Sequence, residues 1–125
     1  MRKCIVLLVL ILFFPASDLL AFYPLYEASR TYNTINSPRA SEIGDFNGDG
    51  NIDLAIAHFG TTYISILIGS PDGIFSPAVT YEVGTDPNSI AAGDFDEDGY
   101  TDLAVANSNS DNVSILIGAG AGTFS

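Results

Sequence analysis

The sequence is poor in positive charge. Lys and Arg together number 4 against 15 Asp and Glu, and the formal net charge is −11. Two of the four basic residues, Arg2 and Lys3, stand at the extreme N-terminus, so only Arg30 and Arg39 remain in the body of the chain. Nucleic acids and anionic membrane surfaces attract basic proteins, and this balance therefore argues against both as partners.

Cysteine and histidine are nearly absent as well. The single cysteine, Cys4, lies close to the N-terminus, and the rest of the chain can form no disulfide of its own. His58 is the one histidine, and the sequence contains no nucleophile-elbow motif. Because a nucleophile and its base are hard to assemble from these residues, we expect no enzymatic activity within them.

The N-terminus has the pattern of a secretory signal peptide. Arg2 and Lys3 precede an unbroken apolar run, Cys4–Phe14, which a polar break and Leu19-Leu20-Ala21 follow. We predict a signal peptide over residues 1–21 with cleavage after Ala21, and Ser17 as the second choice. An uncleaved anchor is the alternative, but the apolar run is too short to span a bilayer. The mature chain is therefore expected to be secreted, or at the cell surface, with no membrane span.

Two nine-residue acidic segments, Asp45–Asp53 and Asp94–Asp102, lie 49 residues apart. In both, oxygen-bearing side chains occupy positions 1, 3, 5 and 9, and glycine occupies position 6. Side chains at this spacing around a tight turn converge on one centre, as binding of a hard cation such as Ca²⁺ requires. A pair of solvated turns is the alternative. Converging carboxylates repel one another without a counter-ion, so the spacing favours metal binding.

The segments belong to a longer repeat. Thr31–Ser76 aligns with Thr80–Ser125 without a gap, and 20 of the 46 positions are identical. A period of this length is typical of repeat architectures. We therefore divide the chain into the signal peptide (1–21), a lead-in (22–30), repeat 1 (31–79) and repeat 2 (80–125).

Within each repeat the pattern indicates strands. Leu54–Phe59 and Ile64–Ile68 are short, apolar and bounded by turn residues, and Ser41–Phe46, Ala78–Val83 and Ser89–Phe95 have a weaker form of the same pattern. No stretch past residue 21 has a convincing helical period. The sequence therefore predicts an all-β fold: a partial β-propeller of about two four-stranded antiparallel blades, with hairpin loops that bind calcium.

The repeats resemble FG-GAP repeats and the related VCBS-type repeats, which build integrin α-subunit-like β-propellers. The resemblance rests on the acidic loop, the Leu-Ala after it, the Ser-Ile-Leu-Ile-Gly strand and the closing Gly-x-Phe, within Gly44–Ser76 and Gly93–Ser125. An EF-hand would instead need glutamate at loop position 12, where Ile56 and Val105 stand, and flanking helices.

In that family the loop holds Ca²⁺ in its bend, so the resemblance implies two calcium sites. The first would use side-chain oxygens of Asp45, Asn47, Asp49 and Asp53 with the carbonyl of Asn51, and the second those of Asp94, Asp96, Asp98 and Asp102 with the carbonyl of Tyr100. Affinities of ~10⁻⁴–10⁻³ M are expected for an extracellular module.

We therefore expect a secreted, calcium-binding, non-catalytic repeat protein for adhesion or protein–protein interaction, with an extracellular protein or glycan as partner. Two alternatives remain open from the sequence: a non-catalytic module or fragment of a larger secreted enzyme, and a carbohydrate-binding lectin. Stacked repeats normally need about three units for stability. Further blades are therefore expected from a longer chain or from self-assembly.

Overall fold

The computed structural model describes residues 29–125, and these residues form strands, turns and loops without any helix. Consequently no helix in this part of the chain could cross a membrane. The predicted signal peptide, residues 1–21, and most of the lead-in lie outside the described residues.

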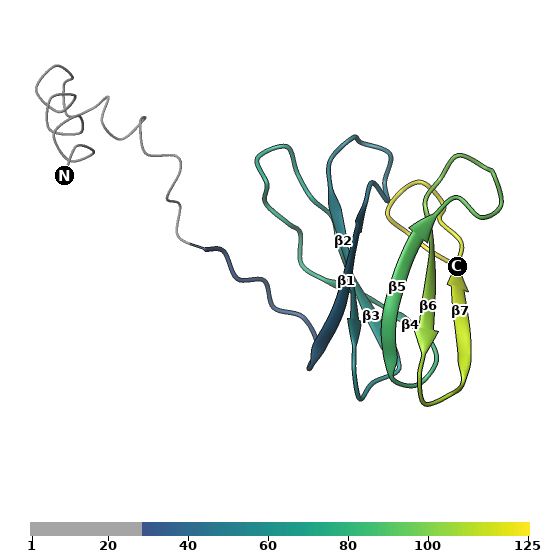
Figure 1. The fold of residues 1–125 in the computed structure, drawn as a ribbon. Coiled ribbons are helices and arrows are strands. Elements are labelled where there is room, and N and C mark those ends of the chain that lie inside the picture. The colour runs from purple at the N-terminus through teal and green to yellow at the C-terminus, as the bar shows by residue number, and fades with distance from the viewer. Residues whose placement is uncertain (1–28) are drawn as a thin grey trace, which may run out of the picture. The chain divides into compact units, whose positions relative to one another are not determined.

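The described residues form seven strands in two antiparallel sheets (Figure 1). The first sheet has the order β1-β2-β3-β4 and the second β5-β6-β7. This confirms the prediction of an all-β fold built from propeller-type blades. The strands are β1 (Pro38–Gly44), β2 (Asp53–His58), β3 (Tyr63–Leu67), β4 (Val79–Glu82), β5 (Pro87–Gly93), β6 (Asp102–Asn107) and β7 (Asn112–Leu116).

The two sheets differ in strand number, although about four strands were expected in each. Within residues 29–125 the second sheet has three, because the counterpart of β4, displaced by 49 residues, would begin beyond Ser125. β4 lies at the boundary between the sequence repeats, yet it pairs with β3 in the first sheet. The outermost strand of the first sheet is therefore formed mainly by the first residues of repeat 2.

The strands next to the acidic loops are shifted from their predicted bounds. β1 and β5 begin at prolines, Pro38 and Pro87, earlier than the apolar pattern indicated, and each pairs irregularly over its first residues. Both end at glycine, Gly44 and Gly93, rather than continuing to the phenylalanine of the loop. Two residues after these glycines, the backbone amides of Phe46 and Phe95 donate to the loop carboxylates Asp53 and Asp102 instead of to the neighbouring strand.

One hydrophobic core joins the two sheets. Buried apolar side chains of β2 and β3 belong to the same cluster as those of β5, β6 and β7, and β5 lies beside β1 and β2. The buried members from the strands are Ala55, Ala57, Ile64 and Ile66 in the first sheet and Ile90, Leu103, Val105 and Leu116 in the second.

Asp86 holds the connection between the two sheets through both its backbone and its side chain, and it has a positive φ of 56°. Its amide donates to the Thr61 carbonyl (2.9 Å), and its side chain accepts from the Gly60 amide (2.7 Å). Its own carbonyl accepts from the Ser108 amide of the second sheet (2.9 Å). This residue therefore bonds the turn after β2 to the turn after β6, on the side of the sheets away from the acidic loops.

Candidate metal centre

Each acidic segment is the connection of a β-hairpin. The first joins β1 to β2, whose last ladder pair is Gly44 with Asp53, and the second joins β5 to β6, where Gly93 pairs with Asp102. The strand directions in Figure 1 place both loops at the same end of the sheets. The predicted placement of the carboxylates on β-hairpins therefore holds for both repeats.

The first carboxylate of each loop organises the backbone around itself. Asp45 accepts hydrogen bonds from the amides of Gly48 (2.7 Å), Asp49 (3.1 Å) and Gly50 (2.8 Å). In the second loop Asp94 accepts from Asp98 (3.1 Å) and Gly99 (2.9 Å). Gly50 and Gly99, at loop position 6, have φ values of 82° and 90°, which only glycine adopts without strain.

The last carboxylate of each loop is fully buried and closes the hairpin. Asp53 accepts from the Phe46 amide (2.7 Å) and from the Gly69 amide (2.8 Å), which follows β3. Asp102 accepts in the same way from Phe95 (2.7 Å) and Gly118 (2.8 Å). The Gly118 amide, and then the Phe95 amide, hold the pKa of Asp102 below its usual value, so this carboxylate stays ionised.

The two glycines that bond these aspartates were not recognised as part of the site from the sequence. A Cβ atom at Gly69 would collide with the carbonyl oxygen of Ile52, and one at Gly118 with that of Thr101. The signal was present, because both repeats end the Ser-Ile-Leu-Ile strand with glycine. These glycines let the chain approach closely enough for an amide to bond the buried carboxylate.

Three carboxylates of the second loop converge. Oxygen atoms of Asp94, Asp96 and Asp102 all lie within 4.8 Å of one another. The pKa of Asp96 is raised, first by partial desolvation within the loop and then by the charges of Asp98, Asp102 and Asp94, although its side chain remains exposed. No lysine or arginine follows Arg39 in the sequence, so repeat 2 supplies no lysine or arginine that could neutralise this charge. A bound cation would do so.

The first loop has a neutral amide where the second has a carboxylate. Asn47 occupies the position of Asp96; its Nδ2 donates to Asp49 Oδ2 (2.9 Å), and its Oδ1 accepts from the Asp49 amide (3.0 Å). Hydrogen bonds from the Asn51 backbone, then from the Asn47 and Asn51 side chains, lower the pKa of Asp49. The uncharged side chain of Asn47 therefore reduces the repulsion among the carboxylates of the first loop, whereas this repulsion remains in the second loop.

The implied backbone ligands lie in the same turn. The amides of Asn51 and Tyr100 donate to Asp49 (2.8 Å) and Asp98 (2.8 Å), the side chains two residues before them. These bonds place both residues within the curve of the loop. Ligation by their carbonyl oxygens stays a prediction.

The oxygen-only donor set fits a hard divalent cation. Carboxylates, amide oxygens and backbone carbonyls are the ligands that Ca²⁺ takes, whereas Zn²⁺ sites are rich in cysteine and histidine. The only histidine, His58, stands at the opposite end of β2 from the first loop and is buried there. The chemistry of the loops therefore matches the ion that the sequence pattern indicated.

Comparison with known families agrees with this architecture. A family model described as FG-GAP-like repeat matches residues 45–105, and one described as FG-GAP repeat matches residues 87–125. Together they cover both acidic loops and all strands from β2 to β7. No curated protein matches the chain significantly. The paired hairpin loops, the two blade-like sheets and the two family matches agree, and the chain is an FG-GAP repeat protein.

Proposed function

We propose that the chain is a secreted, calcium-binding β-propeller-repeat module that acts in adhesion or protein–protein interaction, with calcium in a structural role. FG-GAP repeats of this kind form β-propeller-like interaction modules and are typical of extracellular or cell-surface proteins. The observation that carries the proposal is the convergence of Asp94, Asp96 and Asp102 in a segment that has no basic side chain.

Calcium would stabilise the fold by neutralising charge at the hairpin ends. In each repeat the last loop aspartate already bonds the amide after the neighbouring strand, so an ion held by the loop is coupled to the whole sheet. Binding to the folded state alone stabilises it by mass action. In this proposal the carboxylates hold metal and backbone amides, and we assign no catalytic step to them.

The partner is proposed by class only. The acidic surface does not suit nucleic acid, and a protein or glycan outside the cell fits the setting in which such repeats occur. Further blades, supplied by a longer chain or by assembly, would complete the propeller.

Thermal unfolding with and without calcium tests the structural role. At about 10 mM Ca²⁺ and Kd values of ~10⁻⁴–10⁻³ M, each site adds roughly 1.4–2.7 kcal/mol. For a domain of about a hundred residues, each occupied site raises Tm by about 5–20 °C. Circular dichroism follows the unfolding. The same shift should persist in Glu82→Gln, which removes an exposed carboxylate outside the loops. A Tm that is equal in Ca²⁺ and in EDTA would contradict the proposal.

A further inference from the structure

The peptide bond between Asp86 and Pro87 stands where the connection between the two sheets enters β5, and the backbone there is strained. Asp86 has a φ of 56°, a left-handed conformation that residues other than glycine adopt at a cost. A residue before proline is restricted further, because the proline ring crowds it. Pro87 is fully buried and begins β5, so the strain is not relieved by a shift of the proline.

Hydrogen bonds from the neighbouring turn hold Asp86 in this conformation. Its amide donates to the Thr61 carbonyl (2.9 Å), and its side-chain Oδ1 accepts from the Gly60 amide (2.7 Å). The bond to Gly60 fixes one oxygen of the carboxyl group and leaves Oδ2 for a reaction. The carbonyl carbon of the same residue is the nearest electrophile, since the two groups are separated only by Cα and Cβ.

Two donors meet the carbonyl oxygen of the strained bond. The Ser108 amide (2.9 Å) and the Ser108 hydroxyl (3.0 Å) both donate to the Asp86 carbonyl oxygen. Donors at this position stabilise the negative charge that develops on the oxygen when a nucleophile attacks the carbon. The carbonyl group is therefore polarised by the turn after β6, beside a carboxyl group of its own residue.

The first repeat has the same backbone without this chemistry. Ser37 precedes Pro38 with a φ of 53°, and its carbonyl accepts from the Phe59 amide (3.0 Å). Serine stands there in place of Asp86, and phenylalanine in place of Ser108. The first repeat thus lacks both the carboxyl group and the hydroxyl donor at these positions.

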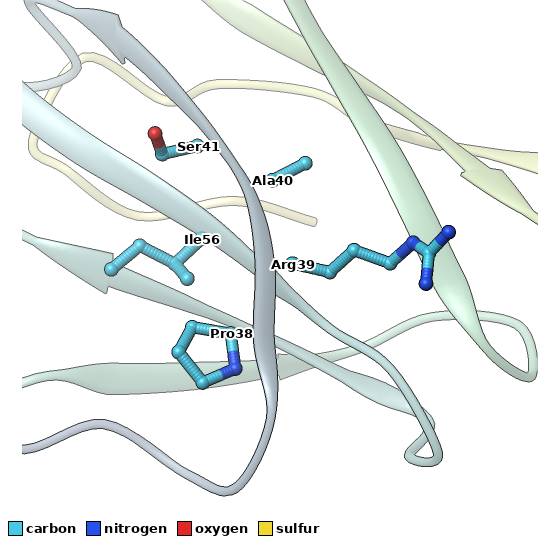
Figure 2. Close-up of a pocket in the computed structure, with 5 residues that line it drawn as sticks. All are labelled: Pro38, Arg39, Ala40, Ser41 and Ile56. Atoms are coloured by element: carbon cyan, nitrogen blue, oxygen red, sulfur yellow. The ribbon is translucent and has the colours of Figure 1, made fainter.

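The two prolines differ in burial as well. Pro38 is exposed and lines a hollow of about 230 Å³ with Ser41 and Ile56 (Figure 2), whereas Pro87 is fully buried. The backbone at Pro38 has room to adjust, and the backbone at Pro87 does not. Of the two equivalent positions, the second alone combines a fixed strained bond, a carboxyl group and paired donors.

We propose that the chain cleaves its own backbone between Asp86 and Pro87. In the acid form of Asp86, Oδ2 attacks the carbonyl carbon of the same residue. A carbon–oxygen bond forms, the bond to the Pro87 nitrogen breaks, and the carboxyl proton passes to that nitrogen. Water then opens the cyclic anhydride. One product ends at Asp86 with two carboxyl groups, and the other begins at Pro87 with a free secondary amine.

The event is a single processing step, because Asp86 is used once, and it goes beyond the proposed calcium function. It cuts the connection between the first sheet and the second. The hydrophobic core shared by the two sheets holds the pieces together, so cleavage releases the strain without unfolding the chain.

Incubation of the purified full chain, in mildly acidic calcium buffer with protease inhibitors, tests the proposal. Mass spectrometry should find one piece that ends at Asp86 and one that begins at Pro87. The pieces should elute together in size exclusion and separate in urea. The same chain, kept unfolded in urea at the same pH, should be cleaved about tenfold more slowly or less, because it lacks the fixed geometry and the Ser108 donors.

Variants at the two residues provide the controls. Ser108→Ala keeps the amide donor and removes the hydroxyl, and it should slow cleavage about tenfold, whereas Ser108→Thr should keep the rate of the unmodified chain. Asp86→Asn retains an oxygen for the Gly60 amide and should stop cleavage. Asp86→Ser, which introduces the residue of the first repeat, should stop it too. Circular dichroism confirms the folding of every variant.

Three results would overturn the proposal. The first is a folded chain that stays intact. The second is cleavage that is as fast in urea as in the folded chain, because the event would then be only the ordinary acid lability of an Asp–Pro bond. The third is a folded Ser108→Ala variant that is cleaved at the rate of the unmodified chain.

Discussion

His58 shows how one buried side chain gives the fold a pH dependence. The side chain is fully buried, and its Nε2 lies 2.8 Å from Ser65 Oγ. Burial lowers the pKa of His58, an effect larger than the opposing one of the Asn36 backbone. Since the folded state favours the neutral ring, its stabilising contribution is complete above the ordinary pKa of about 6.5 and is lost as the pH falls below it.

We therefore expect the free energy of unfolding to decrease between pH 7.5 and pH 5, by at most about 2 kcal/mol from this residue, the limit set by 1.4 kcal/mol per pH unit below 6.5. In His58→Asn the part of this decrease that comes from the histidine should be absent. Asparagine is the natural replacement, because Asn107 fills the same position in the second repeat and donates to Asn112 (2.9 Å) and Ser114 (2.9 Å). Urea denaturation at both pH values measures the difference. An equal decrease in protein and variant would assign the pH dependence to the carboxylates instead.

At the scale of the hairpin, the two loops offer a comparison within one chain. The second has four carboxylates among its predicted ligands, with Glu97 nearby, and the first has three and an amide, with Asn47 in the place of Asp96. More ligand charge favours Ca²⁺, so the second loop should bind more tightly and with greater sensitivity to salt. In Asp98→Ala only the first loop remains intact, and in Asp49→Ala only the second. Calorimetric titration of the two variants with calcium compares the affinities of the two loops.

Exchanging the one differing ligand sharpens this test. Asn47→Asp in the Asp98→Ala background should increase calcium affinity about tenfold, and Asp96→Asn in the Asp49→Ala background should decrease it by about the same factor, or 1.4 kcal/mol. Equal affinities for the two loops, or changes of the opposite sign, would show that charge count does not determine binding here.

These elements also show what the sequence could predict. The central strands followed from short apolar runs bounded by turn residues, and the hairpin position of the loops followed from those strands. The hydrogen bonds that the Gly69 and Gly118 amides donate to Asp53 and Asp102 could not be predicted, because they join residues 16 apart that only the sheet pairing brings together. The strand starts at Pro38 and Pro87 were missed because no apolar residue marks them. Position 9 was predicted as a metal ligand, and its second role in closing the hairpin required the fold.

For the whole molecule, the predicted route of export gives a direct test. Expression of the full chain in a secreting host, with its own N-terminus, should yield a product that begins at Phe22, because the basic, apolar and small-residue pattern before Ala21 fits signal cleavage there. Mass spectrometry of the secreted protein identifies this end. Ala21→Tyr should impair cleavage at that position, since a small residue is required. A product that retains Met1, or that begins at Asp18, would correct the assignment.

Tyr81 has a consequence for how an array of these repeats can be extended. It pairs with Ile64 in the first sheet, and its ring packs against Phe124 in the second repeat, with centroids 5.5 Å apart. Tyr32, its equivalent, packs in the same manner on Phe75 (5.4 Å). One tyrosine thus serves two neighbouring sheets at once. A repeat that carries this tyrosine therefore brings with it a side chain that joins its own residues to the preceding sheet.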